Sequence, residues 1–279
     1  MKNETMSGKT CLVTGANSGI GKETALALAL LGARVIMVCR SHAKGEAARR
    51  KIIGESGNES IDLLLCDLSS LAEVRRLADE ITQKYERLDV LINNAGIFSL
   101  KKDISLDGFE RTFAVNYFAP FLLTILLLPL LKKSVSARIV NVSSVAHFGG
   151  HLDLSQIPWK SSGGMKAYSN SKLALIMFTY ELDRRIKGSN IKVNSLHPGA
   201  VATNIWRLPT FITRPFMTSA KKGARTSIYL ATSPEVERVS GKYFEKMKAV
   251  RSSEESYDDV KSRILWETIS RLVGIEKQD

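Results

Sequence analysis

Two side chains that could carry out acid–base chemistry lie one helical turn apart. Tyr168 and Lys172 are four positions apart near the start of a predicted helix, so they share one helix face. A free phenol has a pKa of about 10 and is a poor acid–base catalyst at neutral pH. An ammonium group nearby favours the phenolate, so we expect Lys172 to lower the pKa of Tyr168. The pair predicts proton transfer to or from a substrate oxygen, although the same spacing also arises by chance.

Two serines are candidates for holding that oxygen. Ser143 and Ser144 end a predicted strand, at the sheet edge where a cofactor would bind. A hydroxyl there can hold a substrate oxygen while Tyr168 transfers the proton. Simple capping of the strand end is the alternative, and the residues alone do not separate Ser143 from Ser144.

A glycine-rich turn lies between the first predicted strand and the first predicted helix. The candidate cofactor contacts in it are Gly15, Asn17, Ser18, Gly19, Ile20 and Gly21. Glycines permit a tight turn and let the backbone approach a pyrophosphate, which then faces the amide groups of the helix N-terminus. A plain tight turn is the alternative, but the place of the motif between a strand and an Ala-rich helix favours a dinucleotide site.

The end of the second predicted strand indicates which dinucleotide binds. A carboxylate there would accept hydrogen bonds from the ribose hydroxyls of NAD, whereas this chain has Cys39 followed by Arg40. Arginine can bind a phosphate through two hydrogen bonds, and Lys44 adds a second positive charge. We therefore expect NADP(H), with an ordinary surface arginine as the alternative.

Further candidate contacts follow the third and fourth predicted strands. Asp67, followed by Leu68, could accept a hydrogen bond from an adenine amino group, or it could cap the helix that begins near residue 69. The small residues of the run Asn94, Ala95 and Gly96 would let the backbone pack against the adenosine half of the cofactor.

Alternating strands and helices must position these residues. The predicted strands are residues 10–14, 34–39, 61–66, 90–93, 138–143, 191–196 and 241–244, and the longer predicted helices are 22–31, 71–85, 106–132 and 166–187. Repeated βα units require right-handed crossovers and a parallel sheet covered on both faces. We predict one α/β domain over residues 1–279. It is a Rossmann-type doubly wound parallel sheet of about seven strands, with a C-terminal helix over about 254–273.

The motif order resembles the short-chain dehydrogenase/reductase family over essentially the whole chain. The resemblance is carried by residues 14–21 and 93–96 and by Asn116, Ser144, Tyr168, Lys172, Pro198 and Gly199. Several stretches are similar to the retinol dehydrogenase branch, namely residues 38–40, 44–46, 141–147, 167–173, 196–199, 241–244 and 266–274. Similarity to the branch fades across residues 145–164.

The resemblance implies a role for each matching residue. It makes Tyr168 the general acid for reduction, the general base for oxidation and a contact of the cofactor. It implies that Lys172 tunes Tyr168 and binds the nicotinamide ribose, that Ser144 positions the carbonyl oxygen, and that Asn116 supports a proton-relay water. The residues that it places against the nicotinamide amide are Pro198, Gly199 and Thr203.

Residues 199–218 are expected to form a lid over the site. The apolar residues in this segment are Trp206, Leu208, Pro209, Phe211, Ile212, Pro215 and Phe216. Such a lid would suit a hydrophobic aldehyde, a ketone or a retinoid-like alcohol, while packing on its own domain or contact with a membrane surface are alternatives. We therefore expect NADP(H)-dependent interconversion of a hydrophobic carbonyl compound and its alcohol. The alternatives are a light-dependent double-bond reductase of the same family and a catalytically silent NADP(H)-sensing protein.

Composition bears on the partners. The net charge is +12, but the positive residues are scattered over predicted helix faces and no nucleic-acid-binding motif accompanies them, so we expect no nucleic-acid partner and at most weak peripheral membrane contact. The three cysteines lack metal-ligand spacing, and His147 and His151, expected on a solvent-exposed loop, lack a matching ligand, so no metal is expected. The polar N-terminus and the free cysteines predict a cytoplasmic protein.

Residues 117–131 are almost wholly apolar. This stretch is shorter than the ~20 residues that span a bilayer, and it contains Pro120 and Pro129. We expect a buried helix, or a helix over residues 107–132 that joins the subunits of a homodimer or tetramer.

Overall fold

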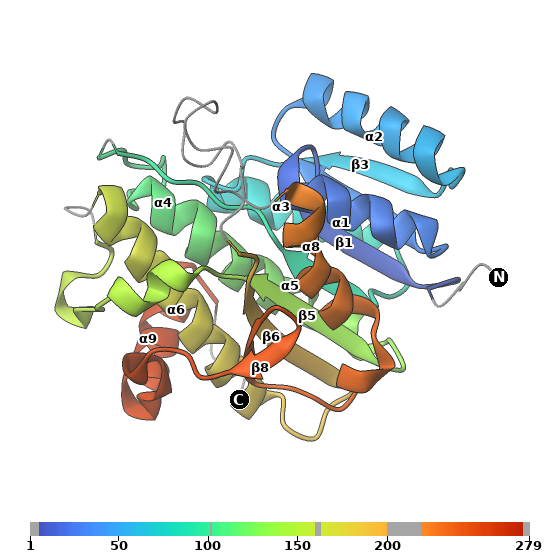
Figure 1. Cartoon of the computed structure of the whole chain (residues 1–279). Helices are drawn as coiled ribbons and strands as arrows, with labels where there is room; N and C mark the ends of the chain where they lie inside the picture. The colour runs from blue at the N-terminus through green and yellow to red at the C-terminus, as the bar shows by residue number, and fades with distance from the viewer. Residues whose placement is uncertain (1–5, 101, 160–162, 200–218, 276–279) are drawn as a thin grey trace.

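The computed structural model describes residues 6–100, 102–159, 163–199 and 219–275. Within them, eight strands form one sheet in the order β3-β2-β1-β4-β5-β6-β7-β8 (Figure 1). The strands are β1 (Thr10–Thr14), β2 (Arg34–Cys39), β3 (Ile61–Leu65), β4 (Val90–Asn93), β5 (Ala137–Val142), β6 (Ile191–His197), β7 (Lys242–Glu245) and β8 (Lys248–Val250). The first seven are mutually parallel and match the predicted strands to within one residue at each end.

The eighth strand was not predicted. It pairs antiparallel with β7, and all three of its residues are exposed. A strand that buries nothing leaves no alternating pattern in the sequence, so periodicity could not reveal it.

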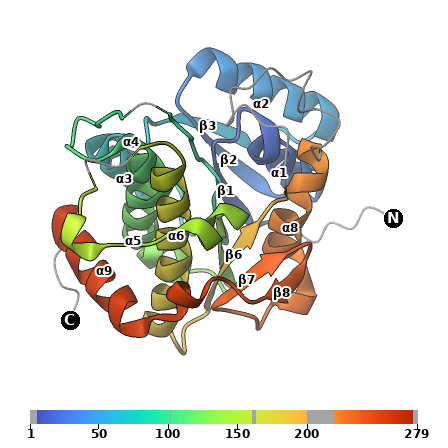
Figure 2. The same ribbon diagram turned by 60° about the vertical axis from the view of Figure 1, so that its left-hand side comes forward.

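Helices cover both faces of the sheet, as predicted (Figure 2). One face carries α1 (Gly19–Leu30), α2 (His42–Ser56) and α8 (Ala220–Thr232), and the other carries α3 (Leu71–Lys84), α5 (Ala119–Lys132), α6 (Gly164–Arg185) and α9 (Asp259–Leu272). Each layer encloses its own apolar core against the sheet. A sheet buried on both faces explains why its central strands are nearly continuous apolar runs.

Two helices differ from their predicted bounds. The helix expected from residue 106 begins at α4 (Arg111–Phe113), where the carboxylate of Glu110 accepts a hydrogen bond from the Phe113 amide, and it passes through a π-helical turn (Ala114–Phe118) before α5. Leu106 is 98% exposed, so its apolar character misled the prediction. The expected helix over 254–273 is divided into a 3₁₀ turn (Glu254–Tyr257) and α9, which Asp258 caps.

The apolar helix of residues 111–132 is a core element. It is long and apolar enough to cross a membrane, yet 83% of its most apolar window is buried inside the protein. Phe121 lies against Phe178 of α6 and Trp266 of α9, with ring centroids 5.1 and 5.0 Å away. Burial within the chain accounts for the lack of charge, and a subunit contact through this helix stays a prediction.

A chain of buried polar groups ties the strand ends to the helices behind them. Asn93 Nδ2 donates to Asn141 Oδ1 at 2.8 Å and to Thr124 Oγ1 at 3.0 Å, and Asn141 Nδ2 donates to Thr179 Oγ1 at 2.9 Å. The four residues belong to β4, β5, α5 and α6. Because buried polar groups must be paired, this network fixes the register of these elements next to the carboxyl edge of the sheet.

Candidate active site

The strand order reverses between β1 and β4, and the connections leaving these strands therefore diverge. In an open α/β sheet the crevice at this point is where ligands bind. The glycine turn follows β1, residues 94–96 follow β4, and Ser144 comes soon after β5. The sequence motifs thus meet at one edge of the sheet.

The glycine turn is closed too tightly for side chains. Gly15 has a φ of +68°, and its amide donates to Val38 O at 2.8 Å. A Cβ on Gly21 would lie 2.4 Å from both Gly15 O and Asn94 Nδ2. Ser18, the N-cap of α1, makes no side-chain capping bond, so the first amides of α1 remain available. Such a cradle fits the pyrophosphate of a dinucleotide.

Thr14 joins this turn to the next loop. Its Oγ1 accepts hydrogen bonds from the amides of Asn94 and Ala95, both at 3.0 Å, and Asn94 Nδ2 donates to Thr14 O at 2.7 Å. Asn94 and Ala95 were predicted as cofactor contacts, whereas Thr14 was recognised as the first residue of the glycine motif but was given no role. The available signal was a hydroxyl at the carboxyl end of the first strand.

Arg40 and Lys44 stand exposed beyond the end of β2. Among the described residues, neither forms a salt bridge. Gly45 lets α2 approach the sheet, because a Cβ there would lie 2.8 Å from Leu63 Cδ1. Two positive charges beyond the end of β2, neither of them in a salt bridge among the described residues, suit a phosphate.

Asp67 does not cap α3. Its Oδ1 accepts from Ser69 N at 3.0 Å and from Ser69 Oγ at 2.7 Å, while Ser70 is the N-cap of α3. Burial alone would raise the pKa of Asp67, but the bonds from Ser69 and the charge of Arg40 hold it below its usual value. The helix-cap alternative is therefore wrong, and the adenine contact stays a prediction. Leu68 packs, partly buried, on the core.

Tyr168 and Lys172 share one face of α6, as predicted. Both are buried, and Lys172 Nζ lies 5.8 Å from the centroid of the Tyr168 ring. The amine donates to Val142 O at 2.8 Å. Burial lowers the pKa of Lys172 to about 8.

The pKa of Tyr168 corrects the sequence-based expectation. Burial raises it, and the hydrogen bond with Ser144 offsets only part of the increase. The expected lowering by Lys172 is not found, because the amine is bonded to a backbone carbonyl and burial disfavours its own charge. Tyr168 is therefore protonated at neutral pH.

The geometry separates the two serines. Ser143 Oγ donates to Lys172 O at 2.9 Å and is buried, so its hydroxyl is already occupied. Ser144 lies beside the Tyr168 phenol and lowers its pKa, and its Oγ accepts a hydrogen bond from Ala146 N at 3.2 Å. Ser144 is the serine positioned beside the acid.

Asn116 lies in the π-helical turn beside Lys172. A Cβ on Gly96 would lie 3.3 Å from Lys172 Nζ and 3.4 Å from Asn116 Oδ1, so both side chains border this glycine. The Asn116 amide accepts from Ile97 N at 2.8 Å and donates to Ile97 O and to Ser171 Oγ. The amide thus holds the loop after β4, and the proton relay stays a prediction.

Apolar side chains border the reacting groups. The Phe98 ring meets the Tyr168 ring edge-on, with centroids 5.7 Å apart. Val145 follows Ser144 and is 50% exposed, and Met165, one helical turn before Tyr168, is 48% exposed. Pro198 and Gly199 follow β6, whereas Thr203 and most of the expected lid fall outside the described residues.

The prediction of two exposed loop histidines was wrong for His147. Its side chain is fully buried, because the 3₁₀ helix Val145–Gly149 turns it inward toward Ser144 O. His151 is exposed and pairs with Glu255 at 2.9 Å.

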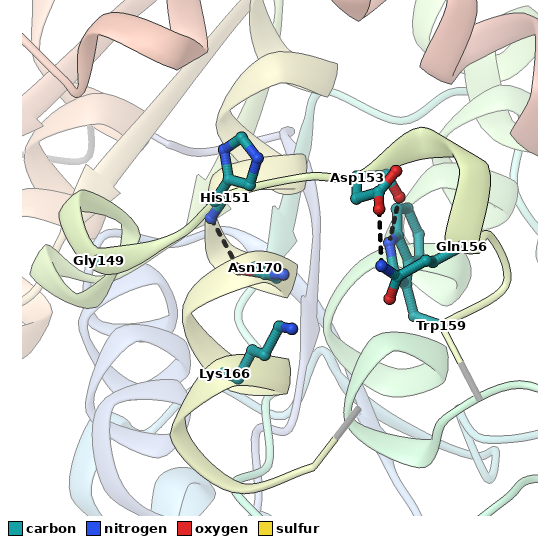
Figure 3. Close-up of a pocket in the computed structure, with 7 residues that line it drawn as sticks. All are labelled: Gly149, His151, Asp153, Gln156, Trp159, Lys166 and Asn170. Carbon is teal, nitrogen blue, oxygen red and sulfur yellow. Dashed lines mark hydrogen bonds between the residues drawn. The ribbon is translucent and has the colours of Figure 1, made fainter. Parts of the chain in front are cut away.

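A hollow of about 330 Å³ beside α6 is separate from these groups (Figure 3). Lys166 and Asn170 line it from α6, facing Asp153 and Gln156. At helical spacing these two residues lie on the flank of α6 opposite Tyr168.

Comparison with known proteins agrees with this geometry. The family model for short chain dehydrogenase matches residues 9–209. The chain belongs to the short-chain dehydrogenase family. It is 42% identical to human retinol dehydrogenase 13 over 286 residues, covering 98% of this chain and 86% of that protein. It is 44% identical to mouse retinol dehydrogenase 14, covering 98% of this chain and 88% of that protein.

Solved structures of short-chain dehydrogenases share the fold. A protein from Mycobacterium paratuberculosis, described as uncharacterized, superposes with a TM-score of 0.82 at 35% identity, covering 97% of this chain and 95% of that one. A short chain dehydrogenase from Escherichia coli CFT073, in complex with NADPH, gives a TM-score of 0.70 at 25% identity, covering 88% and 98%. This chain is thus an oxidoreductase of the retinol dehydrogenase branch that binds a nicotinamide cofactor and acts on alcohol and carbonyl groups.

Proposed function

We propose that this short-chain dehydrogenase uses NADP(H) to interconvert a lipophilic aldehyde or ketone, retinoid-like in character, and its alcohol. The preference for NADP(H) is supported by Arg40 and Lys44, which carry positive charge and form no salt bridge among the described residues. One structural relative is described as bound to NADPH. When bound, the cofactor would supply or accept the hydride at the substrate carbon.

The catalytic side chains handle the proton. In reduction, the Ser144 hydroxyl holds the carbonyl oxygen, and Tyr168 Oη gives that oxygen its proton as the carbon receives hydride. Burial keeps Tyr168 protonated at neutral pH, which suits it as the acid. The phenolate left behind is stabilised by the charged form of Lys172, which a pKa of about 8 leaves mostly protonated at pH 7. Oxidation of the alcohol runs the same transfers in reverse.

The apolar border of the site supports a lipophilic substrate. Phe98 packs edge-on against the Tyr168 ring, and two apolar residues close to Ser144 and Tyr168 in the chain, Val145 and Met165, are about half exposed. An apolar compound would cover this surface and exclude water from the reacting oxygen. Retinol dehydrogenases 13 and 14 are among the relatives with similar sequences.

The proposal depends on one observation, namely that Ser144 and Lys172 flank the buried phenol of Tyr168. Loss of NADPH absorbance with a panel of lipophilic aldehydes should show turnover, and Tyr168→Phe should lower kcat by about 10²–10⁴-fold while leaving NADPH affinity unchanged.

The matched control is Tyr229→Phe, because Tyr229 is a half-buried tyrosine of α8 whose hydroxyl donates to Glu235 instead. Turnover that persists in Tyr168→Phe would contradict the mechanism. Wild-type protein that binds NADPH but reduces none of the panel would favour the silent sensor, and activity that requires light and a bound pigment would favour the double-bond reductase.

A further inference from the structure

The His147 ring bridges Ser144 and the C-terminal segment. Its Nδ1 lies 2.7 Å from Ser144 O, and the amide of Ser253 donates to its Nε2 at 3.1 Å. A backbone amide can only donate, so Nε2 must present its lone pair and the proton must lie on Nδ1. The ring is therefore a neutral imidazole whose Nδ1–H donates to Ser144 O.

The surroundings favour that neutral form. The ring is fully buried, with its centroid 4.8 Å from that of Tyr243 and 4.2 Å from that of Phe148. Burial, assisted by His197, lowers the pKa of His147 against the opposing effect of its bond to Ser144 O. The tautomer is thus fixed at both nitrogens.

Its second partner is itself anchored. Ser252 Oγ bonds Tyr180 Oη of α6 at 2.6 Å, and Ser252 N donates to Tyr257 Oη at 3.1 Å. Two residues after Ser253, the Glu255 carboxylate accepts a hydrogen bond from Leu152 N at 2.9 Å. These bonds hold the Ser253 amide in place, so His147 is braced from the side away from the catalytic crevice.

Ser144 needs such bracing. It is the N-cap of a short 3₁₀ helix with extended backbone (φ −157°, ψ 153°), and its carbonyl receives both the amide of His147, at 3.1 Å, and the His147 ring. The direction of this carbonyl fixes the Ser144 peptide and with it the hydroxyl that meets Tyr168. A short 3₁₀ helix has weak hydrogen-bond geometry of its own.

We propose that His147 is a positioning residue for the Ser144 hydroxyl, acting through its Nδ1–H bond to the Ser144 carbonyl, and that the segment of residues 252–255 braces it. The inference rests on the proposed function, because Ser144 is taken to hold the substrate oxygen.

Two substitutions test the roles of the two ring nitrogens of His147 individually. In His147→Asn the side-chain amide nitrogen can take the place of Nδ1, and in His147→Gln the amide group takes the place of Nε2. We expect His147→Asn to keep kcat within a few-fold of wild type. His147→Gln and His147→Phe should lose about tenfold in kcat, with the Kd for NADPH unchanged in all variants.

The rank order is the test, since both amide variants lose the ring and its packing. The control is His42→Asn, an exposed histidine of α2 that takes no part in these bonds, and it should leave kcat unchanged. The role of His147 would be overturned if all His147 variants had the same kcat as wild type, if His147→Gln had a higher kcat than His147→Asn, or if His42→Asn lost as much kcat as His147→Gln.

A second measurement does not depend on turnover. Nitrogen NMR of the four histidine rings, with His147 assigned by its loss in His147→Asn, should show a proton on Nδ1 and a bare Nε2. A protonated Nε2 would overturn the inference. Absence of any carbonyl turnover in wild type would instead contradict the proposed function. The tautomer of the His147 ring would still show whether Nδ1–H donates to Ser144 O.

Discussion

The cofactor half and the catalytic half of the crevice are constructed from different groups. Around Gly15 and Gly21, backbone atoms form the surface and no space remains for a Cβ. Around Ser144, Tyr168 and Lys172, side chains form the surface, and buried hydrogen bonds hold them. At Gly15 and Gly21 the first half therefore has no room for an added atom, whereas the second half depends on its polar atoms for activity. Substitutions of opposite kinds should expose this difference.

The largest effect is expected from one added methyl group in the cofactor half. In Gly21→Ala the new Cβ would overlap Gly15 O, so backbone must move, and overpacking of about 3 kcal/mol would weaken NADPH binding about 100-fold by fluorescence titration. Gly54→Ala is the control, because no atom lies within 4 Å of a Cβ there and Ala favours the helix. Unchanged affinity in Gly21→Ala would mean that the turn does not contact the cofactor.

A charge change at the end of β2 tests whether a side chain also contributes to the cofactor half, where backbone atoms form the surface of the glycine turn. Arg40→Asp removes a phosphate ligand and introduces repulsion, so the ratio of kcat/KM for NADPH to that for NADH should fall by about 10–100-fold. Arg50→Asp, another exposed arginine of the same region, should not change this ratio. A ratio unmoved by Arg40→Asp would show that Arg40 is an ordinary surface residue.

The smallest effect is a gain of stability in the catalytic half. Burial moves the pKa of Lys172 from 10.5 to about 8, so the charged form destabilises the folded protein by about 3 kcal/mol. Replacing Lys172 by Met removes this cost, but it also removes the hydrogen bond to Val142 O, which contributes about 1 kcal/mol. The free energy of unfolding of Lys172→Met should therefore be about 1–2 kcal/mol higher than that of wild type at pH 7, while its activity falls.

This gain has a defined pH dependence. Between pH 8 and 10.5 the unfolded wild-type chain binds more protons at Lys172 than the folded chain, so wild-type stability rises with pH and the advantage of Lys172→Met shrinks. Denaturant unfolding across this range measures it. Lys166→Met, at an exposed position of α6, should stay within about 0.5 kcal/mol of wild type throughout. An advantage of Lys172→Met that grows with pH would contradict a depressed pKa.

The sequence was sufficient for the parts of this molecule that repeat a pattern. Buried apolar runs between turn residues predicted seven strands. The positions of these strands in the chain then predicted where the glycine turn and the Tyr168–Lys172 pair lie in the fold. Features that depend on distant contacts were not predictable. The burial of His147 and the bond that occupies Ser143 involve partners 106 and 29 residues away, and the pKa of Tyr168 depends on how completely the fold encloses it.

The π-helical turn over Ala114–Phe118 restricts which insertions and deletions this chain can accept. A π turn holds one residue more than the α-helix it interrupts. Removing one residue would rotate everything beyond it by about 100° relative to everything before it. Either Asn116 would leave Ile97, or Thr124 would leave Asn93. The additional residue therefore sets the rotation of the helix. It allows Asn116 near the start of the helix to face the crevice while Thr124 farther along faces the buried polar network.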